Sequence, residues 1–127
     1  MSDKRKILVT GGTGFIGSHT VVELISKGYD VIIADDLSNS RIEVVDAIRV
    51  ISNGIQPLFI QMDLCDRNAT LELFQKYKPH AVIHFAAKKL VGESVSNPLL
   101  YYRNNIDSLL NVIEGAMSIG CYDLVFS

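Results

Sequence analysis

The feature that most constrains this chain is a glycine-rich segment that lies between a short apolar run and a helical pattern. Residues 10–17 read Thr-Gly-Gly-Thr-Gly-Phe-Ile-Gly, a G-x-x-G-x-x-G spacing. The apolar run 6–10 before it predicts a β-strand, and the apolar spacing of 15–27 after it predicts a helix that stops at Gly28. A strand, a tight glycine turn and a helix in this order are typical of parallel α/β folds.

The rest of the chain alternates between strand and helix patterns in the same way. Further strands are predicted at residues 31–34, 57–62, 81–85 and 122–126. Further helices are predicted after a Ser40–Glu43 capping box to about Ile51, after Asp66 to about Tyr77, and from Pro98 to about Ser118. The sequence therefore predicts one Rossmann-like, doubly wound parallel sheet of five strands over residues 1–127, cut off inside the last strand.

Composition excludes several classes of partner. A chain of 127 residues, 48% apolar, forms one domain, and 12 Lys plus Arg against 14 Asp plus Glu gives no attraction for nucleic acid or anionic lipid. No run approaches the ~18 apolar residues of a membrane helix. Two distant cysteines, Cys65 and Cys121, are a poor basis for disulfides, so we expect a reduced, cytoplasmic protein.

The three spaced glycines have separate predicted roles in binding a dinucleotide. Gly11 allows the tight turn, Gly14 lets a pyrophosphate approach the helix, and Gly17 lets helix and strand pack closely. The rival is a nucleoside-triphosphate loop, but the lysine that such a loop needs before Ser18 is missing. A dinucleotide is therefore the favoured ligand.

Asp35 and Asp36 end the second predicted strand, about 20 residues after the glycines. A carboxylate there accepts hydrogen bonds from the adenosine ribose and repels a 2′-phosphate, which favours NAD over NADP. The alternative is that Asp35 is only a solvated acid at a strand end.

Further candidate residues follow the third and fourth predicted strands. Asp63 and Leu64 are placed to contact the adenine, and 85–89 the middle of the cofactor, because open parallel sheets bind ligands beyond their carboxyl ends. Asp63 could instead cap the next turn. We interpret His84 as a packed strand histidine rather than a catalyst, and no Cys or second His near it suggests a metal.

Several segments together resemble one family. They are residues 10–19, Asp35 with Asn39 and Ser40, Asp63-Leu64, Val82–Ala86, Lys89–Ser94 (Lys-Leu-Val-Gly-Glu-Ser), Pro98–Tyr102 (Pro-Leu-Leu-Tyr-Tyr) and Asn104-Asn105. These segments are spread over the whole chain. They resemble the corresponding segments of the UDP-glucose 4-epimerases, which are extended short-chain dehydrogenases/reductases. One departure is that Ala87-Lys88-Lys89 stands where the family usually has Gly-Leu-Lys.

The resemblance implies an enzyme of galactose metabolism that keeps NAD bound and interconverts UDP-glucose and UDP-galactose through a 4-keto sugar. It places Phe15 and Ile16 at the pyrophosphate, 35–40 around the ribose, and Asn104 against the cofactor. The predicted cofactor-binding residues are Gly11, Gly14, Phe15, Ile16, Gly17, Asp35, Asp36, Leu37, Ser38, Asn39, Ser40, Asp63, Leu64, Phe85, Ala86, Ala87, Lys88, Lys89 and Asn104.

The family's catalytic residues, a Ser/Thr and a Tyr-x-x-x-Lys pair, have no counterpart in this sequence. Ser127 aligns ahead of the family's catalytic serine, so we expect the chain to be the amino-terminal part of a longer enzyme and to be inactive by itself. The resemblance is compatible with a homodimer for the full-length enzyme. Two alternatives remain: a stand-alone NAD-binding regulatory module, and another sugar-nucleotide dehydratase or decarboxylase of the same superfamily, which 89–94 disfavours.

Overall fold

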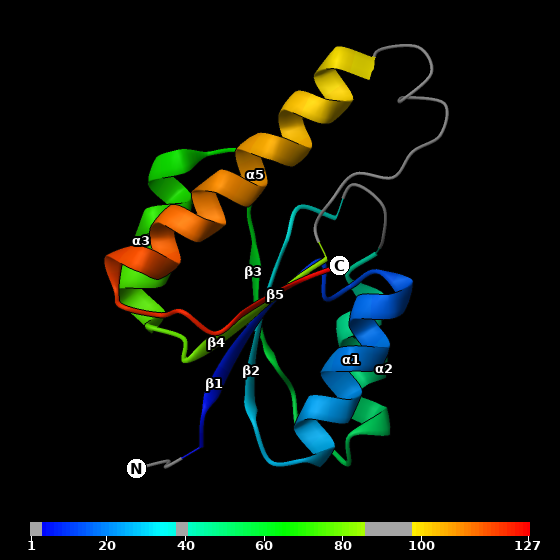
Figure 1. The fold of residues 1–127 in the computed structure, drawn as a ribbon. Coiled ribbons are helices and arrows are strands. Elements are labelled where there is room, and N and C mark those ends of the chain that lie inside the picture. The colour runs from blue at the N-terminus through cyan, green and yellow to red at the C-terminus, as the bar shows by residue number, and fades with distance from the viewer. Residues whose placement is uncertain (1–3, 38–40, 86–97) are drawn as a thin grey trace.

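The computed structural model describes residues 4–37, 41–85 and 98–127, apart from the side chain of Tyr101. Within these ranges a five-stranded parallel sheet lies between two layers of helices (Figure 1). The elements are β1 (Lys6–Thr10), α1 (Phe15–Ser26), β2 (Asp30–Asp35), α2 (Glu43–Ile51), β3 (Leu58–Gln61), α3 (Arg67–Tyr77), β4 (Ala81–His84), α5 (Pro98–Ser118) and β5 (Leu124–Phe126). The predicted α/β class is confirmed.

The sheet has the strand order β3-β2-β1-β4-β5. The first three strands progress outward in one direction, and β4 then lies on the free side of β1, so the winding reverses between β1 and β4. Thr10 and His84, the last residues of these two strands, are register partners. Ligands of open α/β sheets bind beyond the carboxyl ends of the strands at such a reversal.

Two apolar cores form, one on each face of the sheet, because successive strand residues point to opposite faces. Helices α1 and α2 cover one face, and α3 and α5 cover the other (Figure 1). In β1, Ile7 and Val9 belong to the first core and Leu8 to the second. This double burial explains why the central strands read as uninterrupted apolar runs.

Most predicted boundaries agree with the structure, and the start of α2 does not. Asp66 caps α3 as predicted, since its carboxylate accepts a hydrogen bond from the amide of Ala69 at 3.1 Å. Helix α2 begins at Glu43 with Ile42 at its N-cap, so Glu43 is not the third helical residue that the capping box required. The serine of that box, Ser40, lies outside the described residues. No helix in the described ranges is long and apolar enough to cross a membrane.

Candidate functional site

The glycine turn joins the carboxyl end of β1 to α1 and is fixed by backbone hydrogen bonds. Gly11 has a positive φ of 71°, and its amide donates to the carbonyl oxygen of Ala34 in β2 at 3.1 Å. The amide of Gly14 donates back to the carbonyl oxygen of Gly11, also at 3.1 Å. Gly11 therefore makes the tight turn that the sequence predicted.

The other glycines differ in what surrounds them. A Cβ on Gly17 would overlap the carbonyl oxygen of Gly11, so Gly17 lets α1 pack closely on the glycine turn, whereas the sequence predicted close packing on the strand. A Cβ on Gly14 would lie 3.3 Å from the same oxygen and meet nothing closer, so Gly14 is comparatively open. Gly12 was not assigned a role from the sequence, yet its Cβ would lie 2.8 Å from Cγ2 of Ile33. Gly12 lets the turn lie directly on β2.

The amino end of α1 is open to an anion. Its N-cap, Gly14, has no side chain to cap the helix, and the first turn carries no acidic residue. The free amide groups and the helix dipole at such an end attract phosphate. Phe15 and Ile16 are exposed here, and the ring of Phe15 lies 4.8 Å, between centroids, from that of His19. These are the two residues predicted to lie at the pyrophosphate.

Asp35 stands at the carboxyl end of β2 beside the glycine turn. Its Oδ2 accepts hydrogen bonds from the hydroxyl of Thr13 at 2.5 Å and from the Thr13 amide at 3.3 Å, and its Oδ1 accepts from the amide of Leu37 at 2.9 Å. The interpretation of Asp35 as merely a solvated acid is therefore wrong, because the carboxylate is held by the turn. Thr13 is a site residue that sequence reasoning missed.

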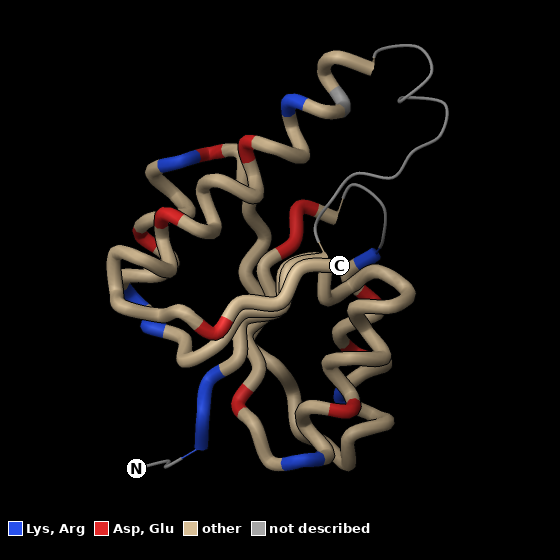
Figure 2. Tube along the Cα trace, viewed as in Figure 1, with Lys and Arg blue, Asp and Glu red and all other residues tan. Residues whose placement is uncertain are grey.

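An acidic segment marks the point where β2 ends, whereas Lys, Arg, Asp and Glu are interspersed over the described helices (Figure 2). Asp36 and Leu37 are half-buried, and Leu37 has a positive φ of 63°. The predicted ribose residues Ser38, Asn39 and Ser40 lie outside the described residues.

The loop after β3 meets α5. Asp63 accepts a hydrogen bond at Oδ1 from the amide of Cys65 at 2.9 Å, so it also closes a turn, as the alternative interpretation expected. The thiol of Cys65 lies 3.4 Å from the carbonyl oxygen of Asn104, so the loop that holds Asp63 contacts α5 at a predicted cofactor residue. Leu64 is buried in the core, and its side chain is not presented to a ligand.

His84 is packed at the end of β4, as predicted for a strand histidine. Its ring is buried, Nδ1 lies 2.7 Å from the hydroxyl oxygen of Thr10, and the ring packs edge-on against Phe126. Burial lowers the pKa of His84 to about 4. Phe85 follows at the same edge, with its amide donating to Thr10 Oγ1 at 3.0 Å. The predicted residues Ala86, Ala87, Lys88 and Lys89 lie outside the described residues.

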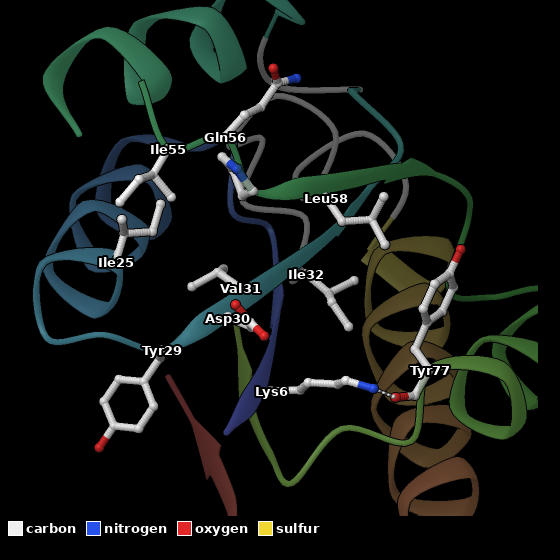
Figure 3. Close-up of a pocket in the computed structure, with 11 residues that line it drawn as sticks. Lys6, Ile25, Tyr29, Asp30, Val31, Ile32, Ile55, Gln56, Leu58 and Tyr77 are labelled. Atoms are coloured by element: carbon white, nitrogen blue, oxygen red, sulfur yellow. Dashed lines mark hydrogen bonds between the residues drawn. The ribbon is translucent and has the colours of Figure 1, made fainter. Parts of the chain in front are cut away.

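A pocket of about 270 Å³ lies at the end of the sheet where the strands begin, opposite to the end that carries the glycine turn (Figure 3). It is lined by residues that begin strands, among them Lys6, Asp30 and Leu58, together with Tyr29 and Tyr77. Because this is the amino edge of the sheet, the pocket is not part of the dinucleotide site. The described residues contain no cluster of three or more His, Cys, Asp or Glu that could hold a metal ion.

The geometry thus consists of a glycine turn, an open helix amino end and a fixed carboxylate at the reversal of the sheet. A sequence model of the family described as GDP-mannose 4,6 dehydratase matches residues 8–126. The chain belongs to this family. Membership of the GDP-mannose 4,6 dehydratase family fits the observed fold and does not by itself define the reaction.

Relatives within this family are named as epimerases. UDP-glucose 4-epimerase of Schizosaccharomyces pombe is 50% identical over 121 residues, which are 95% of this chain and 34% of that protein. The structure of UDP-glucose-4-epimerase from Stenotrophomonas maltophila, with bound NAD and formylated UDP-arabinopyranose, superposes with a TM-score of 0.89 at 43% identity, covering 96% of this chain and 36% of that one.

The epimerase of Bifidobacterium longum, in complex with NAD+ and UDP, has a TM-score of 0.90 at 38% identity, over 96% of this chain and 36% of that one. The resemblance to UDP-glucose 4-epimerases is confirmed by these comparisons. The chain spans 34–36% of the length of several relatives that it matches.

Proposed function

We propose that this chain is the NAD-binding part of an epimerase that interconverts UDP-glucose and UDP-galactose through a 4-keto sugar. The observation that carries the proposal is the fixed carboxylate of Asp35 beside a glycine turn and an uncapped helix. Support for the sugar substrate comes from the names of relatives that are 45–50% identical.

When bound, NAD supplies a reversible hydride acceptor, so that the sugar is oxidised at C4 and then reduced on its other face with no net redox change. The residues of this chain hold that cofactor. The amide groups at the start of α1 bind the pyrophosphate, and Gly14 leaves room for it. Asp35 accepts hydrogen bonds from the adenosine ribose. Asp63 lies on the adenine side of the proposed site, and Asn104 approaches the cofactor from α5; both contact Cys65, which lies between them in the loop–helix contact.

The proton of the C4 hydroxyl needs a base that these residues do not supply. His84 is buried, its pKa is lowered to about 4, and its ring contacts the hydroxyl of Thr10. We therefore assign it a structural role in the sheet and not the role of the base. In the family that the sequence resembles, a Tyr-x-x-x-Lys pair removes this proton, and no such pair occurs here. We therefore propose that residues 1–127 form an incomplete NAD-binding domain of a longer enzyme.

A stand-alone NAD-binding module and a sugar-nucleotide dehydratase are the competing functions. The experiment that separates them uses the full-length protein from the gene that encodes this sequence. We expect it to convert UDP-galactose to UDP-glucose and to release NAD on denaturation. NAD release without any conversion would favour the module, and formation of a 4-keto-6-deoxy sugar nucleotide would favour the dehydratase.

We also propose a homodimer in the cytoplasm. Exposed apolar side chains recur every three or four residues along the first part of α5, at Leu99, Tyr102, Ile106 and Leu110, and exposed Met117 follows seven residues later. Such a stripe suits packing against another helix surface. Light scattering on the full-length protein tests this, because a dimer that Ile106→Glu dissociates would support it. Cys65 and Cys121 are not joined in a disulfide, which suits a reducing compartment.

A further inference from the structure

Thr13 lies in the glycine turn at a place where its side chain does more than close the loop. The turn is already tied to β2 through the backbone bond from Gly11 to Ala34 and through the contact of Gly12 with Ile33. Thr13 donates from its side-chain hydroxyl and from its backbone amide to one carboxylate oxygen, Oδ2 of Asp35, and the bond from the hydroxyl is the shorter. Thr13 is only 2% exposed, so its hydroxyl is sheltered from water, while Asp35 is half-buried.

The Asp35 carboxylate is consequently held from two sides. Thr13 binds Oδ2 from the turn, and the Leu37 amide binds Oδ1 from the segment that follows β2. A carboxylate has about four lone-pair sites, so it can accept these bonds and still bind a ligand hydroxyl. Hydrogen bonds to a charged acceptor are strong, and a carboxylate held in this way loses little freedom when a ligand arrives.

We propose that Thr13 is a positioning residue that fixes the Asp35 carboxylate for a ribose diol and thereby sets the preference for NAD over NADP. The inference rests on the proposed binding of NAD. A fixed carboxylate must face a 2′-phosphate, and the two negative charges repel. Without the Thr13 hydroxyl, the Asp35 carboxylate would turn toward solvent. It would then lose hydrogen bonds to the NAD ribose, and it would repel the 2′-phosphate of NADP less.

The test is a calorimetric measurement of the dissociation constants of NAD and NADP for the full-length protein, depleted of cofactor. For Thr13→Val we expect NAD to bind about 10-fold more weakly and NADP to bind as tightly as before or more tightly, so the NAD/NADP selectivity falls about 10-fold or more. Thr13→Ser retains the hydroxyl and should keep the native selectivity. Thr13→Ala repeats the test should the valine variant fail to fold.

A matched control and a coupling experiment separate positioning from a structural role. Thr70 is also buried and donates its hydroxyl to the carbonyl oxygens of Leu64 and Asp66, just before α3, so Thr70→Val should lower the melting temperature without changing selectivity. In an Asp35→Asn background, Thr13→Val should have no further effect on selectivity. Equal weakening of NAD and NADP by Thr13→Val, or no weakening of either, would refute the role of Thr13. Failure of the unsubstituted protein to bind NAD would refute the proposed function itself, and the inference with it.

Discussion

The hydroxyl oxygen of Thr10 lies 2.7 Å from Nδ1 of His84, so a buried polar contact joins the ends of β1 and β4 where the sheet reverses its winding. The same oxygen accepts the amide hydrogen of Phe85 at 3.0 Å. A neutral imidazole with its proton on Nε2 satisfies this arrangement, because Nδ1 can then accept the Thr10 hydroxyl proton. Thr10 and His84 therefore fix the ends of β1 and β4, next to the proposed cofactor site.

His84 should make the stability of the protein depend on pH. Its pKa is about 4 in the folded protein and about 6.5 when unfolded, so between these values only the unfolded chain binds the proton. The contribution of His84 is complete above pH 6.5 and is lost as the pH falls toward 4, by roughly 3 kcal/mol. Urea unfolding at pH 7 and pH 4 measures this loss.

Replacement of His84 by Asn removes the titration while leaving a polar group. The difference in unfolding free energy between pH 7 and pH 4 should therefore be smaller in His84→Asn than in the native protein. An equal acid dependence in native protein and His84→Asn would contradict the assignment.

Asp35→Ala should weaken NAD binding by roughly 1–3 kcal/mol, the cost of losing hydrogen bonds to a charged group. The binding of NADP should improve relative to NAD, since the charge facing its phosphate is gone. Calorimetry on the full-length protein checks both statements. Equal native affinities for the two cofactors would show that Asp35 does not contact the ribose.

Gly14→Val should abolish NAD binding and leave the sheet folded. A Cβ on Gly14 would lie 3.3 Å from the carbonyl oxygen of Gly11, a contact that a small shift relieves, whereas the added methyl groups would occupy the space proposed for the pyrophosphate. Circular dichroism reports the fold and fluorescence titration reports binding. Gly17→Val is the informative comparison, because its Cβ would overlap the backbone, and we expect it to impair folding itself.

The fold could be predicted because it depends on local signals that the sequence displays directly. The uninterrupted apolar runs form strands as predicted. Local chemistry also sets two helix starts, because Asp66 caps α3 and Pro98 is the first residue of α5. The start of α2 was predicted wrongly because Glu43 three residues after a serine satisfies the pattern of a capping box, while the helix begins at Glu43 itself.

The site could be predicted only in part, because the residues that the sequence analysis did not identify act through tertiary contacts. Thr13 binds a residue 22 positions away, and Thr10 binds one 74 positions away. Gly115 likewise gives no signal in the sequence, yet a Cβ there would overlap the ring of Phe74 where α3 meets α5. Asp35 ends β2, as the sequence predicted, but its hydrogen bonds with the glycine turn are tertiary contacts that no sequence pattern shows.

The 127-residue chain should not epimerise UDP-galactose, even when NAD is supplied. It has no Tyr-x-x-x-Lys pair, and loss of general acid–base catalysis alone costs about 10²–10⁴ in rate. Exposed Val125 and Phe126 on the edge strand β5 should in addition favour aggregation of the isolated chain. A coupled assay for UDP-glucose on the purified chain tests this, with the full-length protein as the positive control. Conversion above background by the 127 residues would place the catalytic base within them and overturn the proposal that they only bind NAD.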